Sequence, residues 1–240
     1  MQNLLKRWEH RYLKPWLRTL KPWRRTTFGG VQITFARHLD GGGSTFGQEF
    51  IPFLQSRGMP VQPRAFEWCA GPGFIGFSLL GHGLCQTLCL ADINPQAVAA
   101  CRRTVEENRL TDRVSIYQSD NLADIPASEQ WNLVVSNPPH FIDDFDAAWT
   151  LRACDQDWHI HRKFFATVGK FLAPGGVIVL QENGRGSTVA TFRDMIDRAG
   201  LAIVFVHGGK PELTVENNFY YIGIMRRGDT PPTWASGPSA

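Results

Sequence analysis

Three glycines in a fixed spacing, Gly71, Gly73 and Gly76, constrain the fold of this chain more than any other feature. The G-x-G-x-x-G spacing permits a tight turn, close approach of the backbone to a ligand, and close packing of a helix on a strand. Residues 65–69 have the composition of a buried strand, and residues 74–80 can open a helix. The pattern therefore predicts a strand–turn–helix unit of an α/β sheet.

Two further strands are predicted downstream, and each leads into acidic or amide residues. Residues 87–91 end in Asp92, which lies 21 residues beyond the first glycine (92−71). A carboxylate there can accept hydrogen bonds from both hydroxyls of a ribose. Residues 114–118 precede Asp120 and Asn121, where a carboxylate could accept from the exocyclic amine of adenine. Each Asp is also typical of an ordinary turn or helix cap, so both interpretations stay open.

A third strand, residues 131–135, leads into the rigid tetrad Asn137-Pro138-Pro139-His140. The two prolines fix φ and donate no backbone N–H, so the strand cannot continue. Asn137 is thereby held at the carboxyl end of the strand, where open α/β sheets bind their ligands. Its amide can both donate to and accept from a planar nitrogen group. An ordinary strand-ending loop is the alternative.

The order of these features resembles that of class I S-adenosylmethionine-dependent methyltransferases that act on amino or amide nitrogens, within the small-domain methyltransferase group. The resemblance covers about residues 64–183 and rests on the glycine-rich turn, Asp92, Asp120 and the Asn-Pro-Pro tetrad. It implies a Rossmann-like α/β fold with a seven-stranded, mostly parallel sheet, an antiparallel last strand, and helices on both faces. It also implies S-adenosylmethionine as the cofactor.

The resemblance assigns roles to individual residues. The glycine-rich loop would lie under the methionine part, Asp92 would hold the ribose, and Asp120 the adenine amine. The expected cofactor contacts are Glu67, Cys69, Ala70, Gly71, Gly73, Asp92, Ile93, Asp120, Asn121 and Asn137. The expected catalytic residues are Asn137, Pro138, Pro139 and His140, and the expected substrate contacts are Phe141, Glu182 and Asn183.

His140 departs from the family pattern, which usually has Tyr, Phe or Trp at this position to stack on a planar acceptor. A histidine stacks less well but can accept a proton near neutral pH, and Phe141 could supply the stacking instead. The departure leaves the cofactor assignment unchanged. The expected catalysis is positioning and electrostatics, without a covalent intermediate.

The rest of the chain supplies the remaining elements of such a sheet. Asn94 and Pro95 are typical of a helix start. Further helices are predicted at residues 46–54, 157–172 and 188–199, a hairpin at 26–40, and strands at 177–180, 201–206 and 219–225. His159 and His161 fall in the second of these helices, and the sequence indicates no catalytic partner for either.

The first 25 residues are strongly basic, with eight Lys or Arg and one acid, so their net charge is +7 (8−1) while the whole chain carries +3. Trp8, Tyr12, Trp16 and Trp23 are interleaved with these charges. This composition suits RNA or a ribosome-associated protein, an anionic membrane surface, a transit peptide, or packing on the catalytic domain. We therefore divide the chain into a basic aromatic arm (1–27), a cap or lid segment (28–60), a catalytic domain (61–226) and a flexible tail (227–240).

Residues 141–157 contain five Asp and one Arg, which favours a cationic acceptor and disfavours phosphate. Three functions stay open: methylation of a planar amino or amide nitrogen of a macromolecule (an RNA base or a protein glutamine), methylation of a small amine or natural product, and RNA binding without catalysis. Five scattered cysteines indicate free thiols in a reducing compartment, without metal ligation. With no apolar leader or membrane span expected, we predict a cytoplasmic enzyme.

Overall fold

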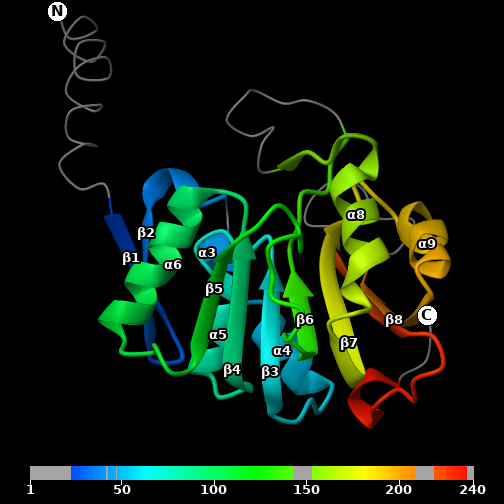
Figure 1. Cartoon of the computed structure of the whole chain (residues 1–240), viewed down its shortest axis with the longest axis horizontal. Coiled ribbons are helices and arrows are strands. Elements are labelled where there is room, and N and C mark those ends of the chain that lie inside the picture. Colours follow the sequence, from blue (N-terminus) through cyan, green and yellow to red (C-terminus); the bar gives the residue numbers. More distant parts are fainter. Residues whose placement is uncertain (1–22, 42, 47, 143–152, 209–218, 237–240) are drawn as a thin grey trace, which may run out of the picture.

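The fold is a single seven-stranded sheet with helices on both faces, seen in a computed structural model that describes residues 23–41, 43–46, 48–142, 153–208 and 219–236 (Figure 1). In spatial order the strands are β5 (Val114–Gln118), β4 (Cys85–Asp92), β3 (Gln62–Trp68), β6 (Trp131–Ser136), β7 (Leu172–Asn183), β9 (Phe219–Arg226) and β8 (Leu201–Gly208). Adjacent strands from β5 to β7 are parallel, while β9 runs antiparallel to both of its neighbours. The predicted fold class is confirmed.

Residues on both faces of the central strands are buried, so their sequences lack the strict alternation of apolar and polar residues that a half-exposed strand shows. Along β3, Ala65 packs into one core cluster and Phe66 into the other. The helices α4 (Phe50–Ser56), α5 (Phe74–Gly81) and α6 (Pro95–Glu107) cover the first face. The helices α8 (His159–Val168) and α9 (Val189–Arg198) cover the second (Figure 1).

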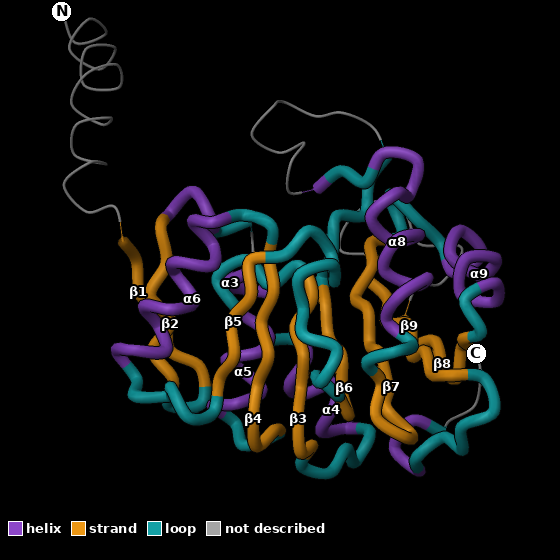
Figure 2. Tube along the Cα trace, viewed as in Figure 1, coloured by secondary structure: helices purple, strands orange, loops and turns teal. Residues whose placement is uncertain are grey.

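Starting from β3, the sheet first grows to one side through β4 and β5 and then to the other side through β6 and β7. The side on which strands are added therefore switches between β3 and β6. The carboxyl ends of the parallel strands all meet at one edge of the sheet, and the loops that follow β3, β4, β5 and β6 lie along it (Figure 2). Such a switch point is where open α/β sheets bind their ligands.

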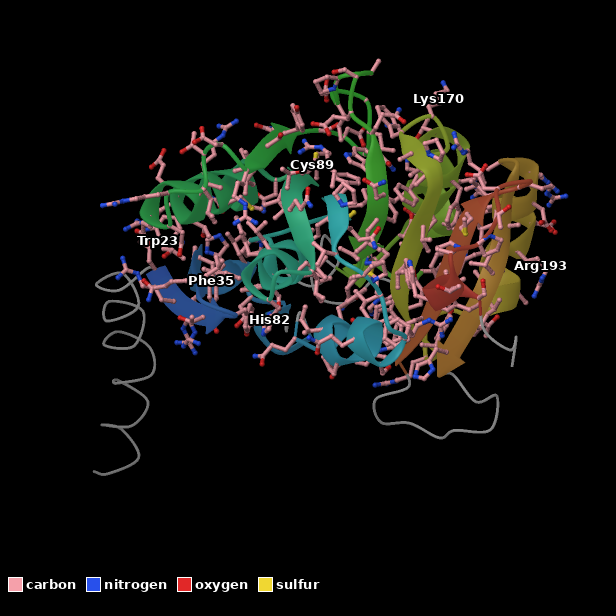
Figure 3. The ribbon with its side chains drawn as sticks, turned by 90° about the horizontal axis from the view of Figure 1, so that it is seen from below. Trp23, Phe35, His82, Cys89, Lys170 and Arg193 are labelled. Atoms are coloured by element: carbon pink, nitrogen blue, oxygen red, sulfur yellow. The ribbon has the colours of Figure 1, made fainter. Side chains whose placement is uncertain are left out.

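The predicted hairpin is present as β1 (Trp23–Phe28) and β2 (Val31–Ala36), and it packs on α6. The Thr34 N–H donates to Thr104 Oγ1 (3.0 Å), and the Thr34 hydroxyl donates to Glu107 Oε2 (2.6 Å). Trp23 lies beside α6, where the Arg103 guanidinium stacks over its ring at 4.7 Å (Figure 3). Because β1 begins at Trp23, it crosses the proposed boundary between arm and cap at residue 27.

Two predicted elements differ from the structure in extent. The predicted helix 46–54 is instead two helices, α3 (Gly43–Phe46) and α4. The helix predicted to reach residue 172 ends at Val168, and Leu172 begins β7. Pro174, Gly175 and Gly176 lie within β7, where its pairing with β6 shifts register. A proline is tolerated at such an irregularity because no ladder hydrogen bond is required of it there.

Part of the segment for which a flexible tail is expected (227–240) is packed against the core. Trp234 and Ala235 are buried in η4 (Thr233–Ala235) and belong to the core cluster on the α5 face. The Arg57 side chain donates to the Trp234 carbonyl (2.8 Å), which ties this segment to the end of α4. Within the described residues, no helix is long and apolar enough to cross a membrane.

Candidate active site

The glycine-rich loop after β3 is held by a buried carboxyl group beneath it. Glu67 accepts hydrogen bonds from the backbone N–H groups of Ile75 (3.2 Å) and Gly76 (2.7 Å) in the first turn of α5. A Cβ at Gly76 would lie 2.8 Å from Glu67 Oε2, so this close approach requires glycine. Burial raises the pKa of Glu67 to about 8 despite these two hydrogen bonds. Glu67 therefore shapes the loop from below.

The loop itself presents open backbone at the carboxyl edge of the sheet. Gly71 and Gly73 have φ of 52° and 81°, which favour glycine, and Cys69 also has a positive φ of 51°. A Cβ built at Gly71 would meet no atom within 4 Å. Ala70, between them, is buried. A ligand can therefore approach the backbone at Gly71 closely.

Asp92 at the end of β4 ties the second strand end to this loop. Its Oδ2 accepts from the Gly71 N–H (2.7 Å) and its Oδ1 from the Asn94 N–H (2.8 Å). Burial raises the pKa of the Asp92 carboxyl, while these backbone hydrogen bonds oppose the rise. Each carboxylate oxygen keeps a further lone pair for a ligand. The neighbouring Ile93 side chain is 63% exposed, an apolar surface beside the carboxylate.

At the end of β5, Asp120 and Asn121 both contact α8 through their side chains. Asp120 is exposed and forms an ion pair with Lys163 on α8 (2.6 Å). Asn121 has a φ of 61°, its Nδ2 donates to the Ile160 carbonyl (2.9 Å), and its Oδ1 is buried without a hydrogen-bond partner. A buried acceptor without a donor is costly. Asn121 Oδ1 is therefore available to an amine of a bound ligand.

Asn137 lies at the end of β6 with its side chain fixed from behind. Its Nδ2 donates to Gln181 Oε1 on β7 (3.0 Å). Gln181 is fully buried, and its own Nε2 donates to Glu49 Oε2 (3.1 Å) and to the Tyr221 hydroxyl (2.9 Å). The network orients the Asn137 amide through its Nδ2, and no described residue donates a hydrogen bond to its Oδ1. The sequence does not predict a role for Glu49 in this site, because no recognisable motif includes the acidic residue before α4.

His140 and Phe141 continue the acceptor loop, which we define as residues 137–141. Both backbone N–H groups donate to the Ala153 carbonyl (3.0 and 2.9 Å). The His140 ring packs edge-on to Phe141, with ring centroids 4.7 Å apart, and its Nδ1 is buried without a partner. Burial, together with the charge of His161, lowers the pKa of His140 to about 4. His140 is therefore neutral at pH 7, contrary to the alternative in which it accepts a proton there.

The two substrate contacts expected on β7 occupy different surroundings. Glu182 is fully buried and bonds through Oε1 to His161 Nε2 on α8 (3.0 Å). Asn183 is half-buried and holds the following turn, accepting from the N–H groups of Arg185 at its side chain (3.0 Å) and Gly186 at its carbonyl (2.9 Å). The structure thus brings Asn137 and His140 to the carboxyl edge of the sheet, while Glu182 is buried beneath α8.

One aspartate of the acidic segment after the tetrad, Asp155, is buried and so is not exposed to a cationic acceptor. Asp143, Asp144 and Asp146 lie outside the described residues. Asp155 is almost fully buried and accepts from the N–H groups of Ile160 (2.7 Å) and His161 (3.0 Å) at the start of α8. Among the residues that the structure describes, no group of three or more His, Cys, Asp or Glu side chains is arranged to hold a metal ion.

Comparisons with known proteins agree with this geometry. The profile of the family described as methyltransferase small domain matches residues 48–198. A release factor glutamine methyltransferase of Clostridium acetobutylicum is 27% identical over 125 residues, which cover 47% of this chain and 44% of that protein. A ribosomal RNA small subunit methyltransferase C of Haemophilus influenzae is 29% identical over 105 residues, covering 42% and 30%. The chain thus spans less than half the length of these relatives.

Solved structures show the same fold at low sequence identity. The 16S rRNA N2 G1207 methyltransferase of T. thermophilus, in complex with AdoMet and guanosine, superposes with a TM-score of 0.58 at 16% identity, covering 86% of this chain and 51% of that one. A glycopeptide N-methyltransferase superposes with a TM-score of 0.55 at 16% identity, covering 77% and 94%. With the family profile matched over residues 48–198, this chain belongs to the methyltransferase small domain family.

Proposed function

We propose that this protein transfers a methyl group from S-adenosylmethionine to a planar amino or amide nitrogen of a macromolecule, as a member of the Asn-Pro-Pro-x subgroup. The observation that carries the proposal is the Asn137 amide, held through its Nδ2 by Gln181 at the carboxyl end of β6, with no donor to its Oδ1 among the described residues. It lies at the same strand edge as the open glycine-rich loop. A ligand site and an N–H acceptor thus meet at the switch point of the sheet.

The described residues fit S-adenosylmethionine. The open backbone at Gly71 suits the methionine part, and the remaining lone pairs of Asp92 suit the ribose hydroxyls. Exposed Ile93 offers an apolar surface to the adenine ring. Its amine suits the unpartnered Asn121 Oδ1, with Asp120 as the alternative acceptor. When bound, this cofactor supplies an electrophilic methyl group on a sulfonium.

The protein's contribution to the reaction is to orient the acceptor nitrogen. A neutral amide or aryl amine is a poor nucleophile because its lone pair is conjugated. Hydrogen bonds from its N–H groups to Asn137 Oδ1 and to the Pro138 carbonyl would localise that lone pair and aim it at the methyl carbon. Pro139 keeps the loop rigid, and neutral His140 with Phe141 would flank the planar group. No covalent intermediate on the protein is required.

The macromolecular acceptor is favoured by the relatives, which are named for ribosomal RNA and for a release factor glutamine. We infer that the basic arm (residues 1–27) contacts RNA or a ribosome-associated protein, that residues 28–60 cap the site, and that residues 61–226 form the catalytic domain. Acceptors of this kind favour a cytoplasmic enzyme. A small amine or natural product is the alternative, favoured by His140 in place of the usual aromatic residue.

The test is a transfer assay with tritium-labelled S-adenosylmethionine, using ribosomal subunits, a release factor and a panel of small amines as acceptors. The wild type should label a ribosomal component or the release factor. Asn137→Ala should lower that labelling by about 100-fold or more, the usual cost of removing one preorganised hydrogen-bonding group from an active site. Gln86→Ala, an exposed amide at the opposite end of β4, should leave it unchanged. Labelling of small amines alone would contradict the macromolecular assignment.

A further inference from the structure

A buried histidine links α8 to the end of β7 through two carboxylates. His161 Nδ1 bonds to Asp155 Oδ2 (2.6 Å), and its Nε2 bonds to Glu182 Oε1 (3.0 Å), and all three side chains are buried (α8 and β7 in Figure 1). Burial alone would lower the pKa of His161, but the two carboxylates outweigh it and raise the pKa to about 9. The histidine is therefore an imidazolium at neutral pH, between two acids.

The second observation is an unsatisfied atom in this cluster. Glu182 Oε2 is buried and has no hydrogen-bond partner, although a buried carboxylate oxygen needs a donor. The neighbouring Ser187 hydroxyl bonds to the Tyr220 hydroxyl (2.9 Å), and it also faces Glu182, where it opposes the rise in pKa that burial causes. His140 Nδ1, on the acceptor loop, is also buried without a partner. Two polar atoms near the same cluster thus lack the donors or acceptors that a ligand would supply.

A continuous chain of hydrogen bonds connects the cluster to the acceptor loop. The loop backbone is paired with Ala153, and the Phe141 carbonyl accepts from the Asp155 N–H (2.7 Å). The Asp155 carboxylate then holds both the start of α8 and the His161 ring. Besides the three members, the titratable groups that face the cluster are Cys69, His140 and Tyr220.

Helix capping accounts for only part of this arrangement. It would explain Asp155, which accepts from two backbone N–H groups at the start of α8. It requires neither His161 nor Glu182, and an apolar pair would dock α8 on β7 without burying charge.

We propose that His161 and Asp155 are positioning residues of the acceptor site, which hold the acceptor loop and present Glu182 Oε2 as a hydrogen-bond acceptor for an N–H group of the methyl acceptor. The inference rests on the proposed function, because it assigns a role toward the acceptor of that reaction. It predicts an acceptor group with more N–H donors than Asn137 and the Pro138 carbonyl can satisfy.

The first test compares Glu182→Gln and His161→Gln with Glu106→Gln, an exposed control on α6. Each variant is titrated calorimetrically with S-adenosylmethionine and assayed for transfer to ribosomal subunits and release factor. Both site variants should keep the cofactor Kd within about threefold and lose about 10- to 100-fold in kcat/KM, as for a lost hydrogen bond to a charged group. The double variant should be no worse than the poorer single one.

Two outcomes would overturn the inference while leaving the proposed function intact. One is Glu182→Gln transferring methyl groups as fast as Glu106→Gln. The other is an equal loss of cofactor affinity and turnover, which would make the cluster merely structural. Absence of cofactor binding or transfer in the wild type would instead count against the proposed function.

The second test needs no acceptor. Hydrogen–deuterium exchange should show the amides of His140 and Phe141 exchanging at least about tenfold faster in His161→Gln, because their pairing with Ala153 depends on the cluster. Nitrogen-15 NMR of the histidine rings should show an imidazolium at pH 8 in the wild type. Unchanged exchange at these amides, or a neutral His161 ring, would contradict the positioning role.

Discussion

At the level of single residues, Asp92 and Glu67 both hold the glycine-rich loop, and Asp92 also faces the ligand site. Both accept backbone N–H bonds that shape the glycine-rich loop, and Asp92 keeps lone pairs for a ligand. Substituting either therefore changes the loop as well as any direct contact. The cleaner single-residue probe is Gln181, which contacts Asn137 from inside the core.

Gln181→Leu should leave cofactor affinity within about threefold of the wild type and lower methyl transfer by about 10- to 100-fold. Leucine nearly matches the volume of glutamine but cannot orient the Asn137 amide, which then loses its fixed acceptor position. Tyr221→Phe is the matched control, because it removes another partner of Gln181 and keeps the bond to Asn137. Calorimetry and the transfer assay measure the two effects. Equal activity of the two variants would count against an orienting role for Gln181.

At the level of elements, the N-terminal hairpin is fastened to α6 by polar bonds rather than by apolar packing alone. Thr34 is fully buried and uses both its N–H and its hydroxyl toward α6. The Glu107 carboxylate that receives the hydroxyl also pairs with Arg103 (2.8 Å) and Arg25 (3.3 Å).

Thr34→Val should therefore destabilise the protein by about 1–2 kcal/mol, the cost of losing one side-chain hydrogen bond to a charged group. Valine keeps the shape and strand preference of threonine, and Thr27→Val on the exposed side of the same hairpin is the control. Urea unfolding of both variants gives the difference in free energy of unfolding. A difference below about 0.3 kcal/mol would show that the hairpin is held by other contacts.

The strands that are buried on both faces were well predicted from the sequence. A short, mainly apolar run such as residues 131–135 is typical of a buried strand. The sequence placed Asn137 correctly, since two prolines must end the strand there. It could not give Gln181 its orienting role, because that depends on the register of β6 beside β7. The sequence indicates no partner for His161, because Asp155 and Glu182 lie 6 and 21 residues away along the chain. They meet the histidine only when α8 packs on the sheet.

Above pH 6.5 the whole molecule should lose stability as pH rises, because two of its buried groups hold their protons more tightly in the folded state. The pKa of His161 is raised from 6.5 to about 9, so its contribution is complete below 6.5 and is lost as pH rises through 9. The pKa of Glu67 is raised from 4.5 to about 8, so its contribution is also lost as pH rises. The pKa of His140 is lowered to about 4, so its contribution is lost as pH falls below 6.5.

We expect the free energy of unfolding to decline between pH 6.5 and 9.5, with His161 contributing about 1–3 kcal/mol of the decline. Urea unfolding over this range should show a smaller decline in the free energy of unfolding for His161→Gln, because this variant lacks the contribution of His161 and keeps that of Glu67. Identical declines in the two proteins would mean that His161 does not carry a proton in the folded state.

The central claim is that the edge of the sheet formed by β3, β4 and β6 binds S-adenosylmethionine. Its most direct test is calorimetric titration of the wild type, of Asp92→Ala, and of Asp112→Ala as an exposed acidic control. We expect micromolar binding by the wild type and the control, and a loss of at least about 100-fold in Asp92→Ala, which removes both the ribose acceptor and the Gly71 bond. No binding by folded wild type, or equal binding by all three proteins, would contradict the account.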